Sequence, residues 1–160
     1  QEPFLYHGTI ASNIRMYHKE LTDEDVRQAA AFVDVADFIE SLPGGYDHPV
    51  TERGSTLSTG QRQLLAFART IAAQPKILIL DEATANIDQE TEEMIQNSLK
   101  KMRQGRTTIA IAHRLSTIQD ADCIYVLDKG KIIESGNHDQ LIALGGTYKK
   151  MYDLQAGMMK

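Results

Sequence analysis

The chain of 160 residues is short of several features that would place it in other classes of protein. A single cysteine, Cys123, excludes an internal disulfide, and no group of His and Cys residues has metal-ligand spacing. No apolar stretch approaches the roughly 18–20 residues that span a bilayer, and no signal-peptide pattern is present. The net charge is −5 with dispersed basic residues, which argues against nucleic acid as a partner. We expect one domain in a reducing compartment, with Cys123 as a small core residue.

A phosphate-binding glycine loop of the form G-x-x-x-x-G-K-S/T is also absent. The sequence has one Gly-Lys pair, Gly130-Lys131, but Ile132 follows it where Ser or Thr is required. Tyr125 occupies the position of the first glycine. This absence is informative because three other patterns in the chain are typical of phosphate chemistry.

The first pattern is LSTGQ at residues 57–61, which opens a predicted helix that should end before Pro75. Ser58 and Gln61 have the spacing of a helix capping box. A helix N-terminus carries unpaired N–H groups and about half a positive charge, so it attracts anions. Gly60 lets a phosphate approach the backbone closely. Taken alone, however, this spacing is most often an ordinary helix cap.

The second pattern is the apolar run Ile-Leu-Ile-Leu at residues 77–80, typical of a strand buried on both faces of a parallel sheet. Asp81 and Glu82 follow at the C-terminal end, where open α/β sheets bind ligands. One carboxylate can hold hydrated Mg²⁺ while the other orients or deprotonates a water. The alternative is a solvated pair of acids at a strand end.

The third pattern is His113, which follows another apolar run at residues 107–112. If the two strands are neighbours, its imidazole lies beside Asp81 and Glu82 and can donate to a phosphate or position a water. The remaining histidines lie in polar or loop contexts, and we interpret them as surface residues: His7, His18, His48 and His138.

Together these residues resemble the nucleotide-binding domain of ATP-binding-cassette (ABC) transporters. LSTGQ at 57–61 resembles the family signature, with Thr59 where Gly is usual. ILILDE at 77–82 resembles the Walker B strand, and ANID at 85–88 resembles the D-loop, usually Ser-Ala-Leu-Asp. His113 matches the switch histidine.

Three segments before the signature extend the resemblance toward exporters. Gln1 resembles the glutamine that opens the Q-loop, and FLYHGTIASNI at 4–14 resembles the exporter segment that follows it. TERGS at 51–55 resembles the exporter loop just before the signature. The resemblance therefore covers essentially the whole chain, with its motifs in the family order.

The resemblance implies a role for each site residue. Glu82 is the catalytic carboxylate with His113 beside it, while Asp81 and Gln1 hold Mg²⁺. Because two cassettes pair head to tail in this family, the signature faces the ATP of the partner. The residues expected to bind nucleotide are Gln1, Ser58, Thr59, Gly60, Gln61 and Asp88.

The expected fold is α/β: a partial P-loop NTPase cassette core, with a parallel sheet and flanking helices, plus a helical subdomain. Residues 4–50 are the expected helical subdomain, which adjoins the signature helix from 57 and meets coupling helices of a transmembrane domain. Residues 57–155 are the expected C-terminal part of the ATPase core, with Walker B, D-loop and switch histidine. Residues 156–160 are expected to fray.

The implied function is ATP hydrolysis, with ATP and Mg²⁺, that drives export across the cell membrane from its cytoplasmic face. The implied partners are a second nucleotide-binding domain, identical or different, and the transmembrane domain. The alternatives are a soluble ABC ATPase of the DNA-repair or translation type, or a catalytically inert fragment. Because no Walker A loop is present, we expect a fragment beginning at Gln1 that does not hydrolyse ATP alone and leaves one face of strand 77–80 open.

Overall fold

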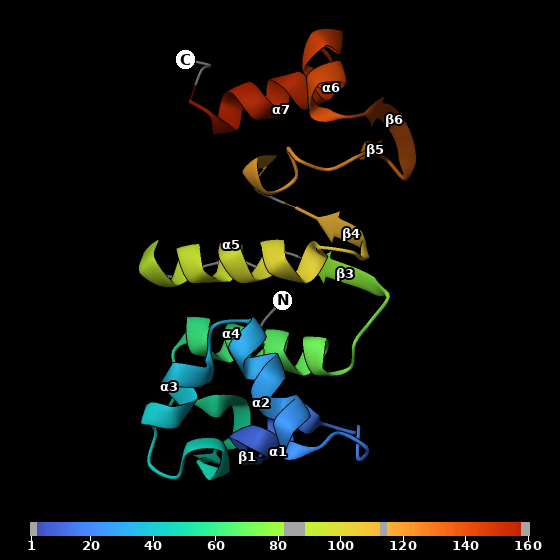
Figure 1. Ribbon diagram of the computed structural model, residues 1–160. Coiled ribbons are helices and arrows are strands. Elements are labelled where there is room, and N and C mark those ends of the chain that lie inside the picture. The colour runs from blue at the N-terminus through green and yellow to red at the C-terminus, as the bar shows by residue number, and fades with distance from the viewer. Residues whose placement is uncertain (1–2, 82–88, 113–114, 158–160) are drawn as a thin grey trace. The chain divides into compact units, whose positions relative to one another are not determined.

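The computed structural model describes residues 3–81, 89–112 and 115–157. The chain divides into two compact units, Gln1–Ile109 (unit 1) and Ala110–Lys160 (unit 2), and each is considered by itself. Figure 1 shows the order of their elements along the chain. No helix in the described ranges is both long and apolar enough to cross a membrane.

Unit 1 begins with short elements joined by tight turns. The two-residue strands β1 (Gly8–Thr9) and β2 (Pro49–Val50) pair in an antiparallel fashion. Thr22 caps the second helix through a capping box with Asp25. The helices between the strands are α1 (Ile10–Arg15), α2 (Asp23–Phe32) and α3 (Ala36–Ser41), followed by 3₁₀ turns at Gly45–Asp47 and Glu52–Gly54.

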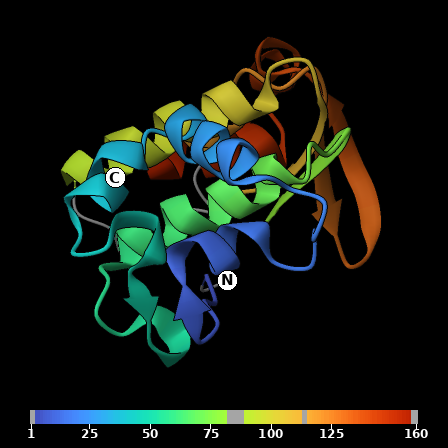
Figure 2. The same ribbon diagram turned by 60° about the horizontal axis from the view of Figure 1, so that its bottom comes forward.

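The core of unit 1 forms around α4 (Thr59–Ala72), which packs against α1, α2 and α5 (Gln89–Arg103). Figure 2 shows α2 and α4 lying side by side. Fully buried side chains from these helices include Ile10, Ile14, Val26, Leu65, Ala68, Ile95 and Met102. On α5, Ile95 and Met102 are buried, whereas Met94 is 38% exposed.

The strands β3 (Ile77–Asp81) and β4 (Thr107–Ile111) are neighbours in a two-stranded sheet. Leu78 is buried, whereas Ile77 and Ile79 are 60% and 68% exposed. The strand is therefore buried on one face only, which matches the expectation of an open face. The described strands form three two-stranded sheets rather than one continuous parallel sheet.

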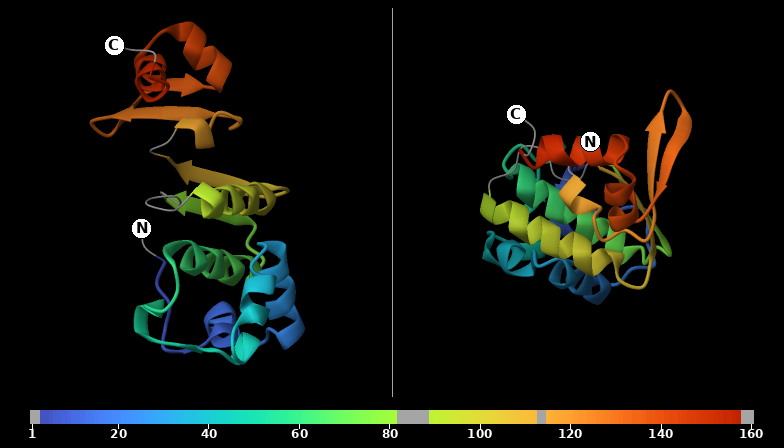
Figure 3. Two further views of the ribbon diagram at one scale, coloured as in Figure 1. Left: turned by 90° about the vertical axis from the view of Figure 1, so that its left-hand side faces the viewer. Right: turned by 90° about the horizontal axis from the view of Figure 1, so that it is seen from above.

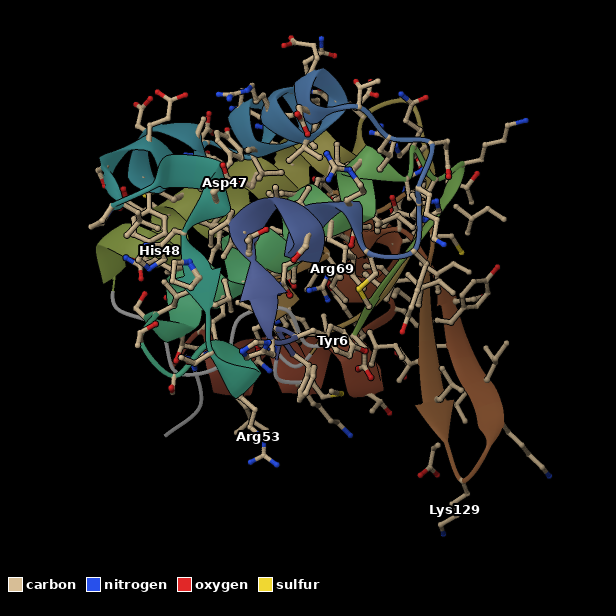
Figure 4. All side chains as sticks on the ribbon, turned by 90° about the horizontal axis from the view of Figure 1, so that it is seen from below. Tyr6, Asp47, His48, Arg53, Arg69 and Lys129 are labelled. Carbon is tan, nitrogen blue, oxygen red and sulfur yellow. The ribbon has the colours of Figure 1, made fainter. Side chains whose placement is uncertain are left out.

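Unit 2 contains a hairpin in which β5 (Ile124–Asp128) and β6 (Lys131–Gly136) pair in an antiparallel fashion (Figure 3). Lys129 lies at its tip, as Figure 4 shows. The helices α6 (His138–Leu144) and α7 (Thr147–Gln155) follow. They are two separate helices because Gly145 adopts a left-handed φ of 68° that ends α6.

A small separate core holds unit 2 together. It consists of Leu115, Ile124, Val126, Leu141 and Tyr148. Cys123 precedes β5 and is exposed, so its interpretation as a core residue is wrong. Successive side chains of a strand point to opposite faces. Ile124 and Val126 take the inward positions here, and Cys123 does not.

Candidate functional site

The N-terminus of α4 has the capping box that its sequence predicts. Ser58 is the N-cap, and its Oγ accepts a hydrogen bond from the Gln61 amide at 3.1 Å. In return, Gln61 Oε1 accepts from the Ser58 amide at 2.9 Å. Side chains thus satisfy two of the four amides that a helix start leaves unpaired.

The capping box leaves donor groups available. Gln61 uses its oxygen as the acceptor, so its NH₂ group remains a donor, and the Ser58 hydroxyl proton can still be donated. The amides of Thr59 and Gly60 have no acceptor within the part of the chain that the structure describes. Ser58 is exposed and Thr59 is half-buried, so their donors are open to an anion from outside the chain, whereas Gly60 is buried.

The first turn of α4 is positively charged. The first turn of α4 contains no acidic residue, so the positive end of the helix dipole is not offset there. Arg62 adds a full positive charge one position further along. Its guanidinium donates to the Leu57 carbonyl at 2.6 Å and to Thr59 Oγ1 at 3.1 Å, which holds it over the turn.

Thr59 is the position where the sequence departs from the usual signature, and its side chain has a local partner. Its hydroxyl oxygen accepts from Arg62, so a glycine here would remove one of the two hydrogen bonds that hold that guanidinium. The sequence patterns did not single out Arg62. Its position four residues after the N-cap was the available signal, because side chains at this spacing share one helix face.

The loop before the signature packs onto the start of the chain. Gly54 has a positive φ of 62°, and a Cβ there would come within 2.9 Å of Leu5 Cδ1 and 3.3 Å of Arg62 Cδ. The Arg53 amide donates to the Leu5 carbonyl at 3.1 Å, and the Leu57 amide donates to the Gly54 carbonyl at 2.9 Å. Only glycine fits the backbone conformation at 54 without strain, so this loop fixes where α4 begins.

Unit 2 contains a helix start in which an anion is already bound. Glu134 of β6 accepts hydrogen bonds from the amides of Thr147 and Tyr148, the first two residues of α7. These bonds, led by the one from Tyr148, lower the pKa of the Glu134 carboxyl. A Cβ at Gly146 would overlap the carboxylate, so a glycine gives the anion room. The corresponding first two residues of α4 are Thr59 and Gly60.

Asp81 is the last residue of β3, and its side chain is exposed. Within the described ranges, no group of three or more His, Cys, Asp or Glu residues could form a metal cage. One exposed carboxylate nevertheless fits Mg²⁺, because this ion keeps several waters and is usually bound by one or two carboxylates together with phosphate oxygens.

Four predicted site residues lie outside the described residues: Gln1, Glu82, Asp88 and His113. For two of them the structure describes the residues just before. The strand β3 ends immediately before Glu82, and β4 is followed by Ala112 and then His113. Their proposed roles therefore rest on the sequence patterns.

Comparison with known proteins identifies the family of the chain. The family model described as ABC transporter matches residues 1–85. A Streptococcus pneumoniae protein named as the ABC transporter ATP-binding protein exp8 is 77% identical over 99% of this chain and 27% of its own length. The Bacillus subtilis protein YheH, named as a multidrug resistance ABC transporter ATP-binding/permease protein, is 54% identical over 98% of this chain and 23% of its own length.

A solved structure of a bacterial Atm1-family ABC exporter with ATP bound is also similar, with a TM-score of 0.87 and 44% identity. It covers 98% of this chain, which matches 27% of the exporter chain. The protein belongs to the ABC transporter family, and nearly all of it is similar to part of that exporter chain. The chain spans about a quarter of the length of the relatives it matches.

Proposed function

We propose that the chain serves in an ABC exporter as a cassette whose α4 N-terminus binds the phosphate of an ATP held by a partner cassette. One observation carries this proposal. The start of α4 presents two amides, a hydroxyl and a side-chain NH₂ as donors, with no acid in its first turn. Removing one such charge-assisted donor typically costs about 1.5–3 kcal/mol.

In the same proposal, residues after β3 and β4 act on the nucleotide of the cassette's own chain. Asp81 and Gln1 hold Mg²⁺, which neutralises phosphate charge when bound. Glu82 acts as general base toward the attacking water, and His113 orients that water or donates to the phosphate. Asp88 contacts the nucleotide from the D-loop. Each ATP-binding site is thus a composite site, because its residues come from two cassettes.

The partners and location follow from the exporter assignment. Residues 4–50 act as the helical subdomain and contact coupling helices of the transmembrane domain, an assignment supported by exposed aromatic side chains: Phe4, Tyr6 and Tyr17. Residues 57–155 belong to the ATPase core, and 156–160 form a frayed tail. The second cassette is identical or different, and the assembly works at the cytoplasmic face of the cell membrane.

The substitution Glu82→Gln in the complete transporter tests the catalytic assignment. It preserves size and hydrogen bonding but removes the base. We expect retained ATP binding, a longer-lived cassette dimer and hydrolysis lowered by about 10²-fold. The matched control is Glu93→Gln on the exposed surface of α5, which should hydrolyse ATP normally. Near-normal turnover of Glu82→Gln would remove this residue from the mechanism.

A further inference from the structure

We propose that Arg69 and Asn13 form a polar clamp that makes the segment 4–9 move together with α4. The inference rests on the proposed function, in which the start of α4 responds to the partner's nucleotide. Arg69 lies in the last turn of the same helix, so a displacement of its first turn carries the guanidinium with it. The clamp then passes that displacement to the segment that follows Gln1.

The guanidinium of Arg69 binds backbone far away in sequence. Its Nε donates to the Asn13 carbonyl at 2.8 Å and its Nη1 to the Phe4 carbonyl at 3.0 Å. Nη2 donates to Asn13 Oδ1 at 3.1 Å. The Tyr6 ring lies 5.7 Å from the guanidinium carbon, and Figure 4 shows the two side chains close together.

Asn13 is 2% exposed and completes the clamp. Its Oδ1 accepts from the Tyr6 amide at 2.8 Å in addition to Arg69. Its Nδ2 donates to the Tyr6 carbonyl at 2.9 Å and to the Thr9 carbonyl at 3.0 Å. The side chain is thus fully engaged, and it fixes the backbone of the segment 4–9 at two residues.

The forked donors of the Arg69 guanidinium suit a directional link between α4 and the segment 4–9 better than apolar packing does. Burial lowers the pKa of Arg69, so placing its charge here is costly. Buried ionic groups are often replaceable by apolar ones without loss of stability. The α1–α4 contact already has an apolar core containing Ile10, Ile14 and Leu65. The clamp therefore adds a directional link to the segment 4–9 rather than bulk stability.

Hydrogen exchange in the complete transporter tests the clamp without knowledge of the transported substrate. We compare the MgADP-bound state with the state trapped by MgATP and vanadate. In the unmodified protein, exchange should slow by about tenfold both at Ser58–Gln61 and at the segment 4–9. In Arg69→Lys, which keeps the charge but loses the fork, the change at Ser58–Gln61 should persist while the change at 4–9 disappears.

Asn13→Asp provides a second variant in case Arg69→Lys does not fold. It keeps the acceptor for Arg69 and for the Tyr6 amide but loses the donations to the Tyr6 and Thr9 carbonyls, so it should reduce the response at 4–9 while the response at Ser58–Gln61 persists. Arg27→Lys is the matched control. Arg27 belongs to α2 and, like Arg69, lies over a tyrosine ring, that of Tyr46. It should leave both responses intact.

The outcomes are distinct. If exchange at 4–9 still follows exchange at Ser58–Gln61 in the folded variants, the clamp does not transmit the displacement. If both responses are lost together in Arg69→Lys and Asn13→Asp, the residues are merely structural and the inference is wrong. An absence of any change at Ser58–Gln61 in the unmodified protein would refute the proposed function, and the clamp with it.

Discussion

The helices α4 and α7 both begin with two backbone amides that need an acceptor, but the acceptor is present only at α7. There, Glu134 bonds to the amides of Thr147 and Tyr148. At α4 the corresponding amides of Thr59 and Gly60 have no acceptor in the described ranges. The filled site shows which ligand this geometry takes: an oxyanion, seated beside a glycine.

The helix α2 adds a third case. Its capping box of Thr22 and Asp25 has the same arrangement as the box of α4. However, its first turn holds three acids, Asp23, Glu24 and Asp25, which offset the positive end of the dipole. A capping box alone therefore does not define an anion site, because acidic side chains in the first turn of a helix repel anions.

The largest expected effect comes from placing a negative charge in the first turn of α4, where α2 carries three acids. Gly60→Asp places a carboxylate at the second helical position, where α2 carries Glu24. Like charges then meet at the phosphate. In complete cassettes, we expect ATP-driven pairing, measured by light scattering, to be lost, while fluorescent-ATP binding to the variant's own site remains.

Two controls separate charge from size. Gly60→Asn has nearly the same volume without the charge and should pair measurably better than Gly60→Asp. Glu24→Gly makes the reverse change on α2 and should leave pairing normal. If own-site ATP binding falls as much as pairing in Gly60→Asp, the assignment to the partner's nucleotide is wrong.

A smaller effect is expected from removing one donor. Ser58→Ala and Thr22→Ala each delete a cap hydroxyl and should each lower stability by about 1 kcal/mol. Only Ser58→Ala should also weaken ATP-driven pairing, by about tenfold, since only that hydroxyl faces the proposed phosphate. Equal pairing in the two variants would mean that Ser58 acts as a cap alone. Chemical denaturation and light scattering measure the two quantities.

Loss of the Arg62 charge should have a milder effect. Arg62→Gln keeps a donor for the Leu57 carbonyl but removes a positive charge near the first turn of α4. We expect pairing to weaken by about threefold at low salt, a difference that shrinks as salt screens the charge. A defect that does not depend on ionic strength would assign Arg62 a structural role.

The smallest effect concerns the filled site at α7. Because its hydrogen bonds lower the pKa of Glu134, the carboxylate stabilises α7 at neutral pH. This contribution is lost as pH falls through the lowered pKa, below the ordinary range of a glutamate. Thermal melting of Glu134→Gln should therefore differ from the unmodified protein near pH 7 and converge with it in acid. A constant difference at every pH would show that charge plays no part.

Local sequence signals predicted much of the fold. The capping box of Ser58 and Gln61 depends on residues within a few positions of each other. The end of α4 was also readable, because Pro75 follows shortly after it. Such features are set by the chain's own geometry and need no distant partner.

Long-range contacts were not predictable in the same way. The clamp joins residues 56 positions apart, and Glu134 reaches α7 from another element. One signal was present: Asn13 shares a helix face with Ile10 and Ile14, so a polar residue sits in an apolar stripe. Apolar character alone did not reveal burial either, as the exposed Ile79 shows.

Mixed pairs of the complete transporter test the central claim most directly. One copy carries Gly60→Asp, the other Glu82→Gln, and differently tagged mixed pairs are purified for ATPase measurement. If the start of α4 serves the partner's nucleotide, one composite site keeps both Gly60 and Glu82 and the other carries both lesions. We predict clear activity in the mixed pair and almost none in either uniform pair. An inactive mixed pair would show that each α4 serves the nucleotide of its own chain.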